Sequence, residues 1–318
     1  MKKSFLAAAV AIGTLIGAGQ AQAEQFVNVL SGGTSGVYYP LGVALSKIYA
    51  DNIKDVRTSV QSTKASVENL NLLNSGRGEV AFTLGDSLSS AWSGDAEAGF
   101  KAKLENLRGI AGIYPNYIQI VARADSGIKT LADLKGKRVS VGPAKSGTEL
   151  NAREILAAGK LSYSDFGKTE YLAFGESVEL MKNRQLDAAI ISAGLGVSAI
   201  RDLSATTAIS VVEIPASIAA AIVNPVYIST KIPAGTYDGV TADVNTVAIK
   251  NFLVTRADLP ADLVYEMTRL MFEKQGDLVS AHAAAKELSL ADAVKGMPLP
   301  LHPGAEKYLK EKGISMTR

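Results

Sequence analysis

A glycine-rich run near the start of this chain constrains the local fold more tightly than any other stretch. The run from Gly32 to Gly42 reads G-G-T-S-G-V-Y-Y-P-L-G and separates an expected strand, residues 26–30, from an expected amphipathic helix. Glycine tolerates φ > 0 and lets the main chain approach a small molecule. The free N–H groups at the helix start can receive an anion. The run is neither G-x-G-x-x-G nor a P-loop, so no nucleotide site is indicated.

The same order of short strand, small polar loop and helix recurs along the chain. This alternation predicts an α/β protein with largely parallel sheets. Tyr114-Pro115-Asn116 is expected to precede a strand rather than to belong to one. Further helices are expected to end at Gly76 and to cover residues 149–158. The other expected strands are residues 56–61, 80–84, 117–123, 139–141, 187–192 and 246–255.

The chain is longer than one compact core usually requires, which predicts two domains. The extended segments 117–123 and 246–255 can run alongside each other and cross between the domains as a hinge. We therefore expect a two-lobed α/β fold with a ligand cleft between the lobes. Lobe one is expected to contain residues 24–116 and 249–318, and lobe two residues 117–248.

The first 23 residues have the three-part layout of a secretory signal. Lys2 and Lys3 precede an apolar segment, and Ala21-Gln22-Ala23 is a small-x-small cleavage site. Cleavage after Ala23 predicts a periplasmic protein. It removes two of 33 basic residues and none of the 31 acidic ones, so the remaining chain has 31 of each and no net charge. A neutral surface argues against nucleic acid as a partner.

Ligands of open α/β sheets bind beyond the carboxyl ends of strands, where loops lead into helix N-termini. Each N-terminus offers about half a positive charge and unpaired N–H donors, so several together can bind a carboxylate without arginine. A cap or turn role is the alternative for each candidate, above all for Ser66 and Asp86. The candidate ligand-binding residues are Thr34, Ser35, Gly36, Val37, Tyr38, Thr63, Ser66, Asn69, Asp86, Tyr114, Ser146, Gly147, Thr148, Phe174 and Glu176.

The glycine-rich run resembles the opening signature of the TAXI family, the substrate-binding proteins of tripartite ATP-independent periplasmic (TRAP) transporters. In that family the position of Ser35 is most often glycine. The resemblance implies a periplasmic-binding-protein fold of the type II kind and places Ala193 and Gly194 in a loop at the cleft mouth. It also implies delivery of the ligand to a TRAP-type membrane permease. It continues through residues 60–69, 85–86, 131–148 and 187–194.

Groups for covalent catalysis are scarce. The chain has no cysteine, and its two histidines, His282 and His302, lack a pairing motif. We therefore expect a monomeric binding protein, without cofactor or metal, that captures a small organic anion such as a dicarboxylate or a glutamate-like amino acid. A binding protein for a sensor kinase or an ABC importer and a periplasmic enzyme are the alternatives.

Overall fold

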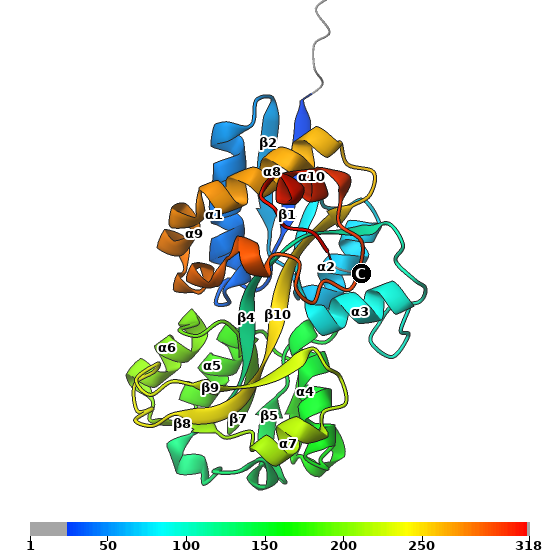
Figure 1. The fold of residues 1–318 in the computed structure, drawn as a ribbon. Coiled ribbons are helices and arrows are strands. Elements are labelled where there is room, and N and C mark those ends of the chain that lie inside the picture. The colour runs from blue at the N-terminus through cyan, green and yellow to red at the C-terminus, as the bar shows by residue number, and fades with distance from the viewer. Residues whose placement is uncertain (1–23, 317–318) are drawn as a thin grey trace, which may run out of the picture.

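The computed structural model describes residues 24–316 and forms two α/β lobes, one above the other in Figure 1. The predicted export signal lies outside the described residues. Lobe one contains β1 (Gln25–Leu30), β2 (Val56–Gln61), β3 (Val80–Leu84), α1 (Tyr38–Asn52), α2 (Ser66–Asn74), α3 (Gly85–Ser93), α8 (Ala261–Glu273), α9 (Gln275–Ala281), α10 (Pro303–Glu311) and the 3-10 turns η4 (Ala283–Glu287) and η5 (Leu290–Asp292). Lobe two contains β5 (Arg138–Ser140), β6 (Lys168–Glu170), β7 (Ala188–Ala193), β8 (Ile209–Val212), β9 (Tyr227–Ile232), α4 (Gly147–Ala158), α5 (Phe174–Lys182), α6 (Ser198–Thr206), α7 (Ala216–Ala221) and the turns η1 (Ala124–Ser126), η2 (Leu131–Leu134) and η3 (Tyr163–Asp165).

Two long strands, β4 (Leu107–Arg123) and β10 (Val244–Arg256), pass through both lobes and cross between them (Figure 1). The sheet has the order β2-β1-β3-β10-β4-β7-β5-β6, with β8 also paired to β4 and β9 to β10. In lobe one, β10 lies between β3 and β4, whereas in lobe two its first half pairs with β9. The two crossing strands predicted from the sequence are confirmed.

Two details of that prediction are wrong. Strand β4 begins at Leu107, well before Tyr117, and it is this earlier part, up to Tyr117, that pairs with β10. The residues after Tyr117 pair with β7 and β8 instead. Pro115 suggested a break, but it lies opposite Lys250, next to a register shift at which β4 has one residue more than β10 between the pairs Lys250–Pro115 and Phe252–Gly112, so the regular ladder is interrupted. Proline is tolerated at such irregularities because no ladder N–H is required there.

The parallel strands of each lobe point their carboxyl ends toward the other lobe. Strand β1 pairs in parallel with β2 and β3, and β5 pairs in parallel with β6 and β7. All five residues of β3 are buried, as expected for an inner strand that is covered on both faces. The loops that follow these strands therefore meet at the junction of the lobes.

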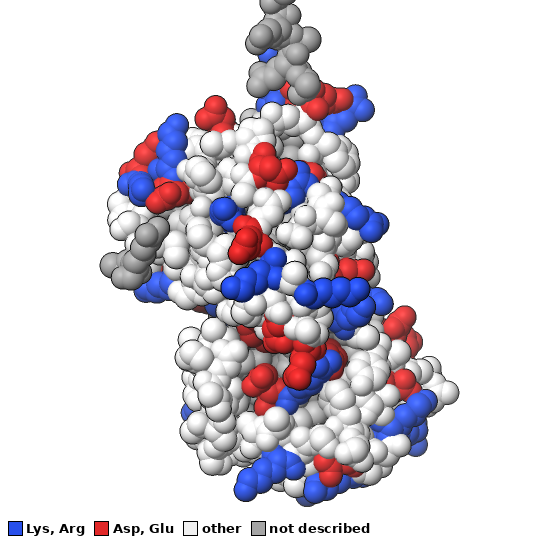
Figure 2. Space-filling view, turned by 90° about the vertical axis from the view of Figure 1, so that its right-hand side faces the viewer, with Lys and Arg blue, Asp and Glu red and all other residues white. Residues whose placement is uncertain are grey.

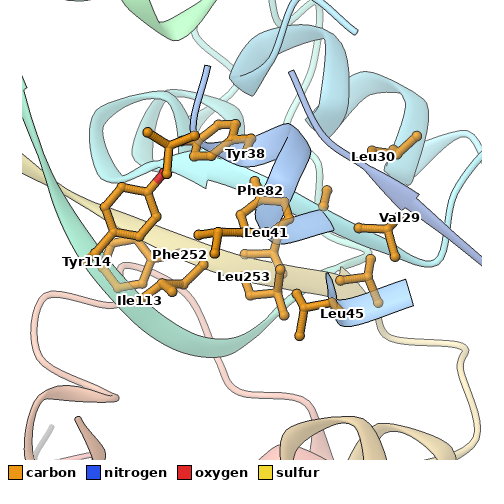
Figure 3. Close-up of a cluster of buried hydrophobic side chains, with 14 of the residues drawn as sticks. Val29, Leu30, Tyr38, Leu41, Leu45, Phe82, Ile113, Tyr114, Phe252 and Leu253 are labelled. Atoms are coloured by element: carbon orange, nitrogen blue, oxygen red, sulfur yellow. The ribbon is translucent and has the colours of Figure 1, made fainter. Parts of the chain in front are cut away.

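The core of lobe one packs α1 against the central sheet (Figure 3). Leu41 of α1 contacts this core together with Phe82 of β3 and Phe252 of β10, all of them almost fully buried. Burial of one such side chain contributes roughly 1.5–3 kcal/mol relative to exposure. A second buried cluster lies in lobe two and includes Ile120 and Val139. The first cluster is not confined to lobe one, because it also contains Val178 of α5 and Ile200 of α6. Apolar contacts therefore stabilise both lobes and continue from one into the other.

The surface of each lobe carries both positive and negative side chains (Figure 2). The molecule is narrowest where the two lobes meet. Within residues 24–316, no helix combines the length and the apolar character that a membrane span requires.

Candidate functional site

A cavity of about 260 Å³ lies between the lobes, at the carboxyl ends of the parallel strands. Residues of both lobes form its wall. From lobe one and the crossing strand β4 these are Gly32, Gly33, Gly36, Val37, Tyr38, Thr63, Lys64, Ala65, Ser66, Leu84, Tyr114 and Asn116. From lobe two they are Pro143, Ser146, Thr148, Tyr171, Ala173, Phe174, Glu176, Ser192 and Ala193.

Most of the candidate residues from the sequence line this cavity. Those that do are Gly36, Val37, Tyr38, Thr63, Ser66, Tyr114, Ser146, Thr148, Phe174, Glu176 and Ala193. The structure thus brings together segments that are far apart in the sequence, and the contribution of each residue to ligand binding stays a prediction.

Four helices begin at the cavity: α1, α2, α4 and α5. The first N–H groups of a helix have no intrahelical acceptor and carry the positive end of its dipole. Ser146 caps α4 by accepting a hydrogen bond from the Glu149 N–H at 3.1 Å. The other N–H groups of that first turn are directed to the same end as the cavity. The site therefore has an electropositive backbone lining from both lobes.

The glycine loop before α1 works differently from the expectation. Gly32, Gly33 and Gly36 do not have positive φ. Gly36 instead closes a tight turn with Gly33 (N to O, 3.0 Å), and a Cβ on it would lie 3.3 Å from the Gly33 carbonyl oxygen. A side chain at Gly36 would therefore crowd the turn unless the Gly33 carbonyl group shifted. The positive φ occurs at Ala65, just before α2, at 68°. Non-glycine residues in such strained conformations cluster at functional sites.

The rings of Tyr38 and Tyr114 form the floor of the cavity on the side of lobe one. The Tyr38 ring stacks on Phe82 with 5.0 Å between centroids and meets the edge of Tyr114 at 6.5 Å. The Tyr38 hydroxyl donates to Asn251 Oδ1. Burial raises the pKa of Tyr38, so the phenol stays neutral. The floor is therefore largely apolar and fixed in position.

Asparagines connect this floor to lobe two. Asn251 Nδ2 donates to Asn116 Oδ1 at 2.7 Å, and Asn116 Nδ2 donates to the Ser192 carbonyl oxygen at 2.9 Å. Asn251 and Asn116 lie on the two crossing strands and are buried. This chain of hydrogen bonds runs through the hinge directly beneath the cavity.

Two charged side chains, Lys64 and Glu176, belong to the residues that line the cavity. Glu176 lies in the first turn of α5, where its Oε2 accepts from the Ala173 N–H at 3.1 Å. Lys64 is exposed and lies at the start of α2. The described lining residues include no arginine.

Asn69 was expected near the ligand, but it lies in the core beneath the loops. Its Nδ2 donates to the carbonyl oxygens of Ser31 at 2.7 Å and Phe82 at 2.9 Å, and its Oδ1 accepts from Thr63 Oγ1 at 2.6 Å. Asn69 is fully buried. It holds the ends of β1 and β3 and the loop after β2 in one arrangement, which makes it a support of the site.

Other candidates lie where the lobes touch rather than on the cavity wall. The Ser35 carbonyl oxygen accepts from Ser198 Oγ at 2.9 Å, across the lobes. Thr34 and Ser35 also line a second depression next to α6. A Cβ on Gly194 would lie 3.0 Å from the Ala284 Cβ of lobe one. Ser35 and Gly194 therefore lie at contacts between the two lobes.

Gly147 and Asp86 also belong to this contact between lobes. A Cβ on Gly147, the first residue of α4, would lie 2.6 Å from Ser66 Oγ and 2.7 Å from Leu84 Cδ1. Asp86 of α3 is buried and accepts hydrogen bonds from Asn151 and Tyr227 of lobe two. Neither lines the cavity.

Sequence reasoning missed several side chains of the cavity. These are Lys64, Ala65, Leu84, Asn116, Pro143, Tyr171, Ala173 and Ser192. Most lie within a few residues of a candidate, in the same strand-end loops. The order of strand, polar loop and helix in the sequence identified most of these loops. Which side chain of a loop faces the cavity depends on the backbone conformation of that loop.

Both histidines have helix-capping roles. His302 Nδ1 accepts from the Gly304 N–H at 3.2 Å, and His282 Nδ1 accepts from the Ala284 N–H at 3.1 Å. Burial lowers the pKa of each. Within residues 24–316 no cluster of three or more potential metal ligands occurs.

Two lobes joined by two crossing strands, with a cavity between them, define the class of two-lobed periplasmic-binding-protein folds. Solved structures of this class match most of the chain at low identity. PhnD1 from Prochlorococcus marinus, in complex with methylphosphonate, has a TM-score of 0.57 at 12% identity and covers 83% of this chain and 91% of its own. A binding protein component of an ABC phosphonate transporter from Pseudomonas aeruginosa has a TM-score of 0.53 at 11% identity, covering 84% and 80%. The alkanesulfonate-binding protein SsuA from Xanthomonas axonopodis pv. citri has a TM-score of 0.50 at 16% identity and covers 92% of both chains.

The family is shown by the sequence itself. The model of the NMT1-like family matches residues 29–313, so this chain belongs to the NMT1-like family. The matched residues contain every segment that lines the cavity.

Proposed function

We propose that this protein captures a small organic anion between its lobes and delivers it to a membrane permease. One observation carries the proposal: the N-termini of four helices, two from each lobe, begin at a single cavity. An anion in the cavity interacts with both lobes at once, so it selects the closed arrangement. Useful capture and release call for a micromolar dissociation constant, about −8 kcal/mol.

The mechanism requires binding groups rather than reacting groups. First-turn N–H groups bind the charged part of the ligand, and the hydroxyls of Thr63, Ser66 and Thr148 add hydrogen bonds. The rings of Tyr38 and Phe174 cover its carbon atoms. An enzyme is the weaker alternative, and conversion of the bound compound during incubation would support it.

For the ligand we propose a dicarboxylate or a glutamate-like amino acid. Lys64 on one lobe and Glu176 on the other suit a ligand that carries both signs of charge, as an amino acid does. Sulfonates and phosphonates are the competing classes, because the solved relatives include an alkanesulfonate-binding protein and phosphonate-binding proteins.

For the partner we propose a TRAP-type permease, on the resemblance of the glycine-rich run to the TAXI family. An ABC importer is the alternative, because a solved relative is a component of an ABC phosphonate transporter. A sensor kinase is a further alternative. A gene for a fused TRAP permease beside the gene for this protein would favour the TRAP-type permease as the partner.

For the location we propose the periplasm, reached by cleavage after Ala23. N-terminal sequencing of protein from osmotic-shock fluid tests this, and an intact Met1 form in the membrane fraction would contradict it.

Native mass spectrometry of protein purified without refolding tests the function. A co-purified small anion supports the proposal, and its mass names the compound. Thermal unfolding with glutamate, succinate, taurine and methylphosphonate then compares the ligand classes, because a ligand that binds the folded form raises the melting temperature. No co-purified anion and no shift with any anion of this panel would contradict capture of such compounds.

A further inference from the structure

A buried carboxylate joins the two lobes beside the cavity. Asp86 belongs to α3 of lobe one and is 6% exposed. Its Oδ2 accepts from Asn151 Nδ2 of α4 at 2.6 Å and from the Tyr227 hydroxyl of β9 at 2.8 Å. Asn151 Nδ2 also donates to the Tyr227 hydroxyl at 2.8 Å. Two side chains of lobe two thus converge on one carboxylate of lobe one.

Asp86 accepts several hydrogen bonds and, within residues 24–316, forms no salt bridge. On α3, the Ser87 N–H and hydroxyl donate to Oδ1. Tyr38 of α1 and Tyr227 of β9 approach as neutral phenols, and Glu154 of α4 adds a like charge. Burial is the largest effect and raises the pKa of Asp86 to about 6, against the opposing hydrogen bonds of Tyr227 and Ser87.

Separation of the lobes would remove the contacts with Asn151 and Tyr227 and return Asp86 to water. An aspartate in water has a pKa of about 3.9. A carboxyl group whose pKa is higher in the closed form binds a proton more tightly there. By linkage, closure becomes more favourable as the pH falls through the higher value.

The amide of Asn151 is suited to both protonation states. Its Oδ1 is buried and makes no hydrogen bond within the described part of the chain. With Asp86 ionised, Nδ2 faces the carboxylate. Rotation of the Asn151 amide group by half a turn would instead bring Oδ1 next to Asp86. A protonated Asp86 could then donate a hydrogen bond to that oxygen. Asn151 can therefore pair with Asp86 whether or not the proton is bound.

We propose that Asp86, Asn151 and Tyr227 form a proton-coupled latch, in which closure of the lobes takes up a proton at Asp86. The latch rests on the proposed capture by closure and adds to it a dependence on pH. The closed-to-open ratio should rise about tenfold between pH 7 and pH 5. Ligand affinity should rise with it.

The absence of cysteine makes a distance measurement straightforward. Ala50 on α1 and Ala205 on α6 are exposed residues on different lobes. Cysteines at both positions, carrying spin labels, report the lobe separation by double electron–electron resonance. The separation is measured at several pH values without added ligand, and with glutamate, succinate, taurine or methylphosphonate.

Three variants in this background decide the role of Asp86. Asp86→Asn imitates the protonated group and should favour the closed form at every pH. Tyr227→Phe removes a hydrogen bond that lowers the pKa of Asp86, so the midpoint of the pH dependence should move to higher pH. Asp238→Asn, at an exposed loop position, is the control and should behave as the parent.

The outcomes separate the latch from the function. A closed population that grows at low pH and no longer responds to pH in Asp86→Asn supports the latch. Closure by an anion of the panel without any pH dependence in the parent overturns the latch and leaves the proposed function intact. Lobes that stay at one separation under all conditions contradict both.

Discussion

Thr148 is the side chain on which hydrogen bonding to the ligand can be tested with least disturbance. It is the second residue of α4, is 7% exposed and lines the cavity. Valine keeps its shape but removes the hydroxyl. We predict that Thr148→Val weakens binding of the co-purified ligand by roughly 1 to 3 kcal/mol, measured by calorimetry, with little change in stability.

Thr241→Val, at an exposed position in the loop before β10, is the matched control and should bind as the parent does. Equal affinity of Thr148→Val and this control would exclude Thr148 as a ligand contact.

At the residue scale, sequence reasoning found polar residues at strand ends but not the direction in which each one points. Asn69 and Asp86 illustrate the limit. Both follow the expected pattern, yet Asn69 points into the core and Asp86 toward lobe two. Such a choice depends on which carbonyls and donors the other elements bring near, and these come from residues far away in the sequence. Ser146 and Thr148 lie on the cavity as expected because the start of α4 fixes them.

At the element scale, the start of α4 packs closely against lobe one through Gly147. A Cβ there would lie 2.6 Å from Ser66 Oγ. The backbone of Gly147 does not have positive φ, so alanine suits the helix itself and stabilises it relative to glycine. We predict that Gly147→Ala keeps or raises the melting temperature of the ligand-free protein and lowers ligand affinity at least tenfold, because closure is blocked.

Gly276→Ala is the control for this prediction. Gly276 lies in α9, and a Cβ on it would have no neighbour within 4 Å. The ligand affinity of Gly276→Ala should equal that of the parent protein. Unchanged affinity in Gly147→Ala as well would show that close packing at this point is not needed for capture.

Strands were predicted well where an apolar segment is bounded on both sides by turn residues. The predicted segments 56–61 and 80–84 coincide with β2 and β3. Strand β4 was cut short because Pro115 is a strong local signal against a strand. The register shift that accommodates it arises where an extra residue of β4 lies opposite β10, so it becomes visible only once the two strands are paired. Local sequence therefore predicts the elements, and pairing decides where they begin.

At the scale of the whole molecule, β4 and β10 are the two long strands that connect the lobes. The boundaries predicted from the sequence, at residues 116/117 and 248/249, stay a prediction. With few covalent connections, we expect the lobes to separate when no ligand joins them. The contacts at Ser35, Asp86, Gly147 and Gly194 would all be lost on opening.

Small-angle scattering of the protein, with and without saturating co-purified ligand, tests capture by closure most directly. We predict a smaller radius of gyration with ligand, together with a melting temperature that rises with ligand concentration. A ligand that raises the melting temperature but leaves the scattering profile unchanged would show that the cavity is preformed and would contradict capture by closure of the lobes.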